Sequence, residues 1–192
     1  ITNANAFVVK IMRTPTAVPT GSTWACCLAD RRITVKGGVW DYDGIVTNFT
    51  VADTTAKIGI LLAGVGNLTM NSIVVNNAIK YAFSFGAINC MFAKDLHTDI
   101  NASDLCKSYG PMFNCHIDGL SGKTGDDVGT FQTREGTPYV QYAFSYGEIL
   151  NCSYSNMHAH SEHSLVGAYC SPTELMDQIV FENIGGASVD QG

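Results

Sequence analysis

The sequence predicts an all-β fold, a parallel β-helix in which short strands wind into a single solenoid. Apolar landmarks recur along the chain at spacings of 23, 24, 37 and 27 residues, at Ile73, Leu96, Leu120, Met157 and Ile184. No helical periodicity of 3.6 residues extends over more than about ten positions. Short strands at a fixed period with turns between them are typical of solenoids, and a period of about 22–25 residues suits a turn of three short strands.

Each period contains a short segment that is rich in β-forming residues and broken by Gly, Asn and Asp. In chain order these segments are NLTMNSIVVNN (67–77), AINCMFAKDLHTD (87–99), FNCHIDGLSGKT (113–124), EILNCSYSNMHAHS (148–161) and DQIVFENIGG (177–186). We expect them to stack at the ~4.8 Å spacing of paired strands. An antiparallel sandwich of short strands is the alternative, and it explains the composition but not the repeats described next.

Two repeated phrases indicate places that the chain revisits. Asn-Cys occurs at Asn89-Cys90, Asn114-Cys115 and Asn151-Cys152, which predicts an Asn ladder with a Cys ladder beside it. YAFSFG (81–86) and YAFSYG (142–147) are predicted to occupy one wall of the solenoid, two turns apart. Strand alternation places Tyr81, Phe83 and Phe85 on one face, which is either core or an exposed interface.

Composition and charge exclude several classes of protein. The 192 residues fit one β-helix domain (1–192), and 46% of them are hydrophobic, enough for a substantial core. A net charge of −6 without a basic run argues against nucleic acid as the partner. The longest apolar run, residues 58–66, is far short of the ~20 residues that cross a bilayer, so no membrane insertion is expected. Because the chain starts at Ile1 without Met, we expect a fragment of a longer helix.

The seven cysteines are odd in number and contain no CxxC pair, so neither a zinc knuckle nor a redox motif is predicted. We expect most of them to be free, buried thiols that pack as small apolar groups. Such thiols favour folding in a reducing compartment.

Acidic residues fall in register with the period. Asp104 precedes Asp126 by 22 residues, and His163 follows Asp127 by 36, which matches the one enlarged period. Asp104, Asp126, Asp127 and His163 are therefore predicted to lie on one face of three adjacent turns, with carboxylates roughly 5–8 Å apart. Glycosidases use such a pair as acid and base or nucleophile. The alternative is structural, because Gly-Asp-Asp is also a good turn sequence.

Other residues are predicted to contact a sugar chain. Aromatic rings that could stack on sugars are Trp40, Tyr81, Phe83, Phe85, Tyr109, Tyr139, Tyr142 and Tyr146. The enlarged turn carries an insertion, 133–141, that would form a loop over the groove. The predicted substrate-binding residues are Lys107, Tyr109, Arg134, Glu135 and His160. His158 and His160 form an HxH pair without an evident third ligand, so no metal or cofactor is predicted.

Three phrases carry a resemblance to a known family. ITVKGGVWDYDG (33–44) resembles the GG-x-WDG-x-G opening phrase of pectate-lyase-like right-handed β-helix proteins, and SDLCKSYGP (103–111) and SGKTGDDVGTF (121–131) resemble two of their turns. The group includes polygalacturonase-like glycoside hydrolases and bacteriophage tailspike or appendage depolymerases. By this resemblance the fold is right-handed, Asp104 matches the first conserved Asp of polygalacturonases, Asp126 and Asp127 match their Asp pair, and His163 lies near their His-Gly motif.

The chain departs from the polygalacturonase pattern at three places. The Asn before the first Asp is Asn101, three residues away rather than two; Ser164 replaces the Gly after His; and no Arg-x-Lys follows. The missing Arg-x-Lys counts against cleavage of plain pectin. The tailspike group varies its sites widely and tolerates all three departures.

The expected function is therefore a phage tailspike-type β-helix that binds and hydrolyses a bacterial surface polysaccharide. The resemblance implies a homotrimer, located in the virion tail if the protein is from a phage and otherwise secreted. A non-catalytic glycan-binding adhesin or fibre segment is one alternative. A calcium-dependent polysaccharide lyase is another.

Overall fold

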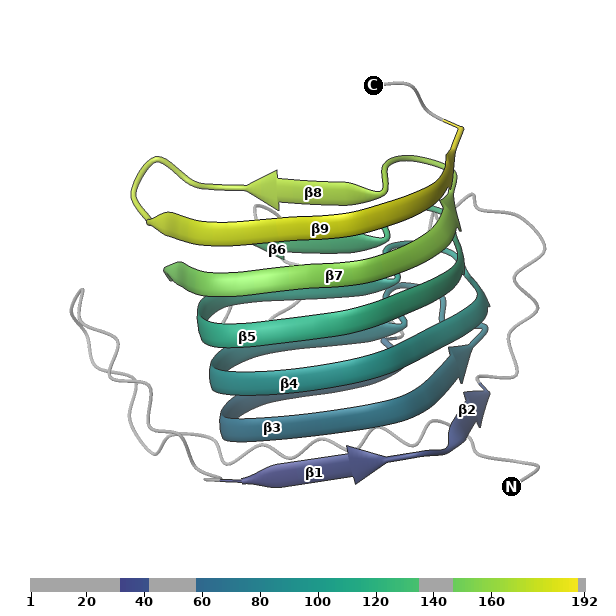
Figure 1. Cartoon of the computed structure of the whole chain (residues 1–192), viewed down its shortest axis with the longest axis horizontal. Coiled ribbons are helices and arrows are strands. Elements are labelled where there is room, and N and C mark those ends of the chain that lie inside the picture. The colour runs from purple at the N-terminus through teal and green to yellow at the C-terminus, as the bar shows by residue number, and fades with distance from the viewer. Residues whose placement is uncertain (1–31, 42–57, 135–146, 190–192) are drawn as a thin grey trace.

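The computed structural model describes residues 32–41, 58–134 and 147–189, and every regular element in them is a β-strand (Figure 1). The nine strands are β1 (Ile33–Lys36), β2 (Val39–Asp41), β3 (Ile60–Asn76), β4 (Phe83–Asn101), β5 (Cys106–Thr124), β6 (Gly129–Gln132), β7 (Ile149–Ser161), β8 (Val166–Tyr169) and β9 (Met176–Ser188). All of their pairings are parallel. The prediction of an all-β fold is confirmed. The described residues hold no helix that is long and apolar enough to cross a membrane.

The strands stack so that the chain returns to the same place at each turn. The long strands pair in the order β3-β4-β5-β7-β9, and the first residues of β4 and β5 continue into a second row, through β6 to β8. Figure 1 shows these ribbons one above another, with the chain rising from β1 to β9. The arrangement is compatible with a β-helix-like fold.

Each long strand bends at a residue with positive φ, and these residues form a column. Its members are Gly37 (65°), Ser72 (54°), Asp95 (53°), Gly119 (82°), Asn156 (53°) and Asn183 (52°). Gly, Asn and Asp tolerate this left-handed conformation better than other residues do. The side-chain amide of Asn183 donates to Asn156 in the next turn, and that of Asn156 donates to Asp118. The Gly, Asn and Asp punctuation of the sequence therefore marks the bends of the strands.

The core lies inside the stack and follows the apolar landmarks. Ile73 pairs with Leu96, Leu96 pairs with Leu120, and Met157 pairs with Ile184, as their spacing predicts. Ile73, Leu96 and Leu120 are fully buried. Rings stack across turns in the same interior: the centroid of Tyr154 lies 4.5 Å from that of Phe131 and 6.0 Å from that of Phe181.

The predicted Asn-Cys ladder is right for two of its three members. Asn151 donates to the side chain of Asn114 at 2.8 Å, and Cys152 pairs with Cys115. Cys115 then pairs with Met91 rather than Cys90, so the 89–90 pair lies one position out of register. The cause is a register shift between Gly86 and Ile88, where the next turn contains an additional residue at the cis Gly110-Pro111 bond.

This shift also changes the expected burial of the thiols. Cys106, Cys115 and Cys152 are free and buried, as predicted. Cys90 and Cys170 are free but exposed, which corrects the expectation for these two. Cys26 and Cys27 lie outside the described residues.

The two YAFS phrases do not share a wall two turns apart. Phe83–Gly86 pairs with Cys106–Tyr109, and that segment pairs with β6, which therefore occupies the predicted place of the second phrase. Residues 142–146 of the second phrase lie outside the described part of the chain. Phe83 and Phe85 are fully buried in the core, so the core alternative holds for these two rings.

Candidate functional site

Three short turns carry the predicted catalytic residues. They connect a long strand to the short strand that follows it, at 102–105 after β4, 125–128 after β5 and 162–165 after β7. Main-chain hydrogen bonds stack them, from Leu105 N to Asp127 O (3.0 Å) and from Val128 N to Ser164 O (3.1 Å). The structure therefore places the predicted carboxylates and His163 on three adjacent turns.

A buried polar residue at the end of each long strand fixes each turn. Asn101 donates to the carbonyl oxygens of Ser103 (2.7 Å) and Asp104 (2.8 Å). Thr124, in register with it, donates to the carbonyl of Ser103. Ser161 donates to the carbonyl of Asp126 at 2.7 Å and accepts from the backbone N–H of His163 at 2.9 Å. These side chains satisfy turn backbone groups that burial would otherwise leave without partners.

The predicted catalytic side chains meet in one hydrogen-bonded cluster. The Nδ1 atom of His163 lies 2.9 Å from Asp127 Oδ1 and 3.5 Å from Asp126 Oδ1. The Oγ1 atom of Thr130 lies 3.2 Å from Asp104 Oδ2 and 3.1 Å from Asp127 Oδ2. Those two carboxylate oxygens are therefore no more than about 6 Å apart, close to the ~5.5 Å carboxyl separation of retaining glycosidases.

Burial and charge move the pKa values of the two bridged carboxyls in opposite directions. Burial raises the pKa of Asp104 to about 6, against the opposing charge of Lys107, whose Nζ lies 2.9 Å from Asp104 Oδ2. The nearby Asp126 and Asp127 add to the rise. Burial also opposes ionisation of Asp127, but hydrogen bonds from Ser164 and His163 and the charge of Lys107 hold its pKa below the usual value. Asp104 can thus hold a proton near neutral pH while Asp127 remains ionised.

Three contributors to the cluster were not predicted from the sequence. Thr130 bridges the two buried carboxyls, and Ser164 donates to Asp127 Oδ1. Tyr169 donates to Asp127 Oδ2 at 3.1 Å, and its ring is 47% exposed. Burial, then the charge of Asp127, raises the pKa of Tyr169 to about 12, so its hydroxyl stays a donor. Their signal was the pairing of β6 with β8, which a dipeptide search does not detect.

A glycine makes room for this arrangement. A Cβ atom at Gly167 would lie 2.6 Å from Asp127 Oδ2 and 2.7 Å from the ring of Tyr169. Any other residue would push the carboxylate and the ring apart. Gly167 is therefore part of how the sequence builds the cluster.

The predicted substrate-binding residues do not all join this cluster. Lys107 does, through Asp104, and its Nζ lies 5.5 Å from the centroid of the Tyr169 ring. Tyr109 is only 2% exposed and its hydroxyl bonds to that of Tyr81 at 3.0 Å, which corrects its assignment as a ring open to sugar. Arg134 pairs with Glu174 at 3.2 Å, and Glu135 lies outside the described residues. His160 bonds to Glu162 at 3.0 Å and lines a separate pocket.

The cluster also contains a set of metal-ligating groups. One ligand atom from each of Asp126, Asp127 and His163 lies within 4.8 Å of the others. The donors are two carboxylate oxygens and an imidazole nitrogen, a set that suits borderline divalent cations better than calcium, which prefers oxygen alone. Asp127 already accepts from Ser164, Thr130 and Tyr169, so its lone pairs are largely occupied by protein donors.

Comparison with protein-family models, with curated proteins and with solved structures finds no match to this chain. The resemblance to pectate-lyase-like proteins therefore depends on the three sequence phrases alone.

Proposed function

We propose that the stack is a right-handed parallel β-helix and that the Asp104–Asp127 cluster hydrolyses a glycosidic bond of a polysaccharide. The observation that carries the proposal is the pair of carboxyls, bridged by Thr130, whose pKa values are driven apart. Glycoside hydrolysis needs one protonated and one ionised carboxyl near the same bond.

Thr130 supports a shared proton between the two carboxyls. Its hydroxyl contacts both Asp104 and Asp127 but carries a single proton. Both contacts are good hydrogen bonds when one carboxyl is protonated and donates to the Thr130 oxygen, which in turn donates to the other. The raised pKa of Asp104 makes it the protonated member.

Exposure divides the roles among the acidic residues. Asp104 supplies the proton to the leaving group. The side chain of Asp126 is 46% exposed, whereas that of Asp127 is 3% exposed. Asp126 is therefore the base or nucleophile that meets water and sugar, while Asp127 stays ionised and orients His163. His163 is half-exposed and lies beside both, where it stabilises the bound sugar.

The exposed ring of Tyr169 gives this site a surface for a sugar. Apolar faces of sugars stack on aromatic rings, and Tyr169 is fixed beside Asp127 by its hydroxyl. With the resemblance to tailspike depolymerases, this favours a bacterial surface polysaccharide as substrate and a homotrimeric, virion-borne or secreted protein.

The test separates hydrolysis from binding. The wild-type chain is incubated with capsules, O-antigens, teichoic acids and pectins, and new reducing ends are measured together with binding. We expect Asp104→Asn and Asp126→Asn each to lower turnover by about 100-fold or more while binding remains. Ultraviolet absorbance of an unsaturated, calcium-dependent product would instead indicate a lyase.

Non-catalytic glycan binding is the second candidate. It is favoured by the burial of Asp104 and Asp127, each only 2% exposed, which suits a structural polar network as well as a catalytic one. Binding by the wild type without any reducing ends across the whole panel would support this candidate and overturn hydrolysis.

A further inference from the structure

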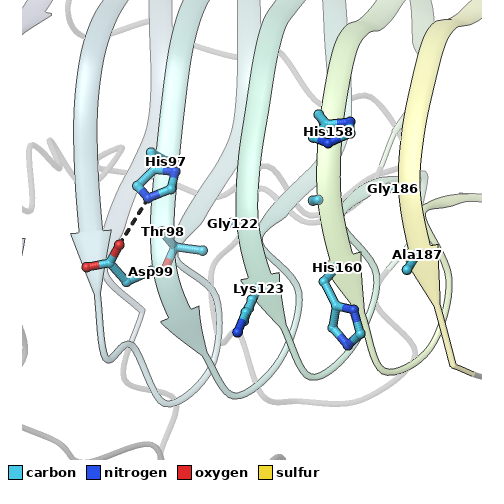
Figure 2. Close-up of a pocket in the computed structure, with 10 residues that line it drawn as sticks. His97, Thr98, Asp99, Gly122, Lys123, His158, His160, Gly186 and Ala187 are labelled. Carbon is cyan, nitrogen blue, oxygen red and sulfur yellow. Dashed lines mark hydrogen bonds and ion pairs between the residues drawn. The ribbon is translucent and has the colours of Figure 1, made fainter.

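A second groove lies on the outer face formed by the last residues of the long strands, away from the carboxylate cluster (Figure 2). It has a volume of about 610 Å³ and crosses four strands, β4, β5, β7 and β9. The strand register places His97 beside Ser121 and His158 in one row. A second row contains Lys123, His160 and Ala187. The two rows are two residues apart along each strand, roughly 7 Å.

Small residues form the floor between these two rows. Thr98, Gly122, Ala159 and Gly186 are in register from turn to turn. Gly122 and Gly186 have φ values of 133° and 135°, and a Cβ atom on either would lie 1.8 Å from a carbonyl oxygen of the neighbouring strand. Glycine is therefore required at both positions. The floor stays low, and the side chains of the two rows stand above it.

The charges in the groove favour an anion. Asp99 is already held by the side-chain amide of Asn76 at 3.0 Å and by His97 Nε2 at 3.1 Å. Glu162 at the edge is held by His160 at 3.0 Å. Lys123 is exposed and makes no ion pair with any described residue. Figure 2 shows Lys123 and His160 extending from neighbouring strands at the same end of the groove. The ammonium group of Lys123 is thus the charge left uncompensated.

We propose that this groove binds an acidic saccharide chain lying along the stack, with a carboxylate paired to Lys123 and hydroxyls bonded to His97, His158 and His160. An extended polymer fits because the groove crosses four strands, about 15 Å at the spacing of paired strands. A metal ion does not fit, because the metal-competent group among the described residues is the one at Asp126, Asp127 and His163, and it includes none of the groove imidazoles. The groove lies apart from the proposed catalytic cluster, so its binding does not depend on hydrolysis.

The five histidines allow both sites to be followed in one experiment. His97, His158 and His160 line the groove, His163 lies in the carboxylate cluster, and His116 is bonded to Ser153 outside both. Imidazole resonances of the full chain are recorded by NMR during titration with an oligouronate, with its fully methyl-esterified form and with inorganic phosphate. Lys123→Gln is the test variant. Lys94→Gln, an exposed lysine in β4 outside the groove, is the matched control.

We expect the oligouronate to shift the three groove imidazoles but not His116, and we expect the esterified form to bind much more weakly. Lys123→Gln should weaken oligouronate binding about fivefold, as loss of one exposed charge pair does, while Lys94→Gln changes it less than twofold. Shifts confined to His163, equal losses in the two lysine variants, or equal affinity for phosphate would each overturn the proposal. None of these outcomes decides whether the carboxylate cluster is catalytic, which the reducing-end assay measures.

Discussion

Ionisation of the buried Asp104 should make the stability of the protein depend on pH. The pKa of this carboxyl rises from 3.8 to about 6 on folding, chiefly because burial removes it from water. The folded state therefore binds the proton more tightly than the unfolded chain does, so the stability this group contributes is present below about pH 4 and lost as pH rises through 6. At 1.36 kcal/mol per pKa unit, the loss between pH 4 and pH 8 is about 3 kcal/mol.

Chemical unfolding of the wild type and of Asp104→Asn, followed by circular dichroism from pH 4 to pH 8, measures this loss. Removal of the ion pair with Lys107 displaces the variant as a whole, so the informative quantity is how the difference between the two proteins varies with pH. We expect the wild type to lose about 3 kcal/mol relative to the variant over this range. Asp127→Asn is the control of opposite sign: the pKa of Asp127 is lowered on folding, so its stabilisation is lost as pH falls. A flat difference for Asp104→Asn would refute the assignment of a raised pKa.

Two further predictions concern the fold. Gly122→Ala should destabilise the protein by about 3 kcal/mol or more, because its Cβ would overlap the Thr98 carbonyl at 1.8 Å, whereas Gly64→Ala, with φ of 73° and open space, should cost only about 1 kcal/mol; thermal unfolding that ranked them equally would contradict the close approach of the strands. Tyr154→Phe should cost about 1–2 kcal/mol, because it removes the partner of the buried Ser108 hydroxyl at 2.8 Å, and adding Ser108→Ala should recover most of that loss in chemical unfolding; a double variant that stays equally destabilised would place the cost in ring packing instead.

The spacing of apolar residues was enough to predict the stacked strands, because a buried residue must recur once per turn. Ile73, Leu96 and Leu120 are in register as predicted. The Asn-Cys dipeptide was a weaker guide, because an additional residue near Gly110 changes the register within one turn. Such an irregularity alters the period by a single position, which is within the natural variation of the repeat.

The same counting explains what was right and wrong about the candidate site. The short strands β5 and β6 pair 23 residues apart, so Asp104 is in register with Asp127 rather than with Asp126 at 22. The pairing of β6 with β8 is 37 residues apart, which aligns Ser164 with Asp127 and His163 with Asp126. The in-register members point inward and are buried, and Asp126 and His163 lie beside them, half-exposed. The sequence predicted the cluster, but its period had not been assigned closely enough to separate buried from exposed members.

Tyr169 shows a limit of a different kind. It occupies the row of Gln132 and Tyr109 in the preceding turns, yet Tyr109 is 2% exposed and Tyr169 is 47% exposed. Equivalent positions in successive turns have the same backbone direction but different neighbours outside the stack. Sequence period predicts the first property and says nothing of the second, so the exposed ring beside Asp127 required the structure.

The position of the one large insertion accounts for how the cluster survives in an irregular repeat. The period of 37 residues arises between β6 and β7, where residues 133–148 separate the two strands. The three turns that carry Asp104, Asp127 and Ser164 keep the same length, at 102–105, 125–128 and 162–165. Each is also fixed by an in-register polar residue at the end of the preceding strand, Asn101, Thr124 or Ser161. Because the additional residues enter on another side of the stack, the three turns stay aligned and their side chains remain within hydrogen-bonding distance.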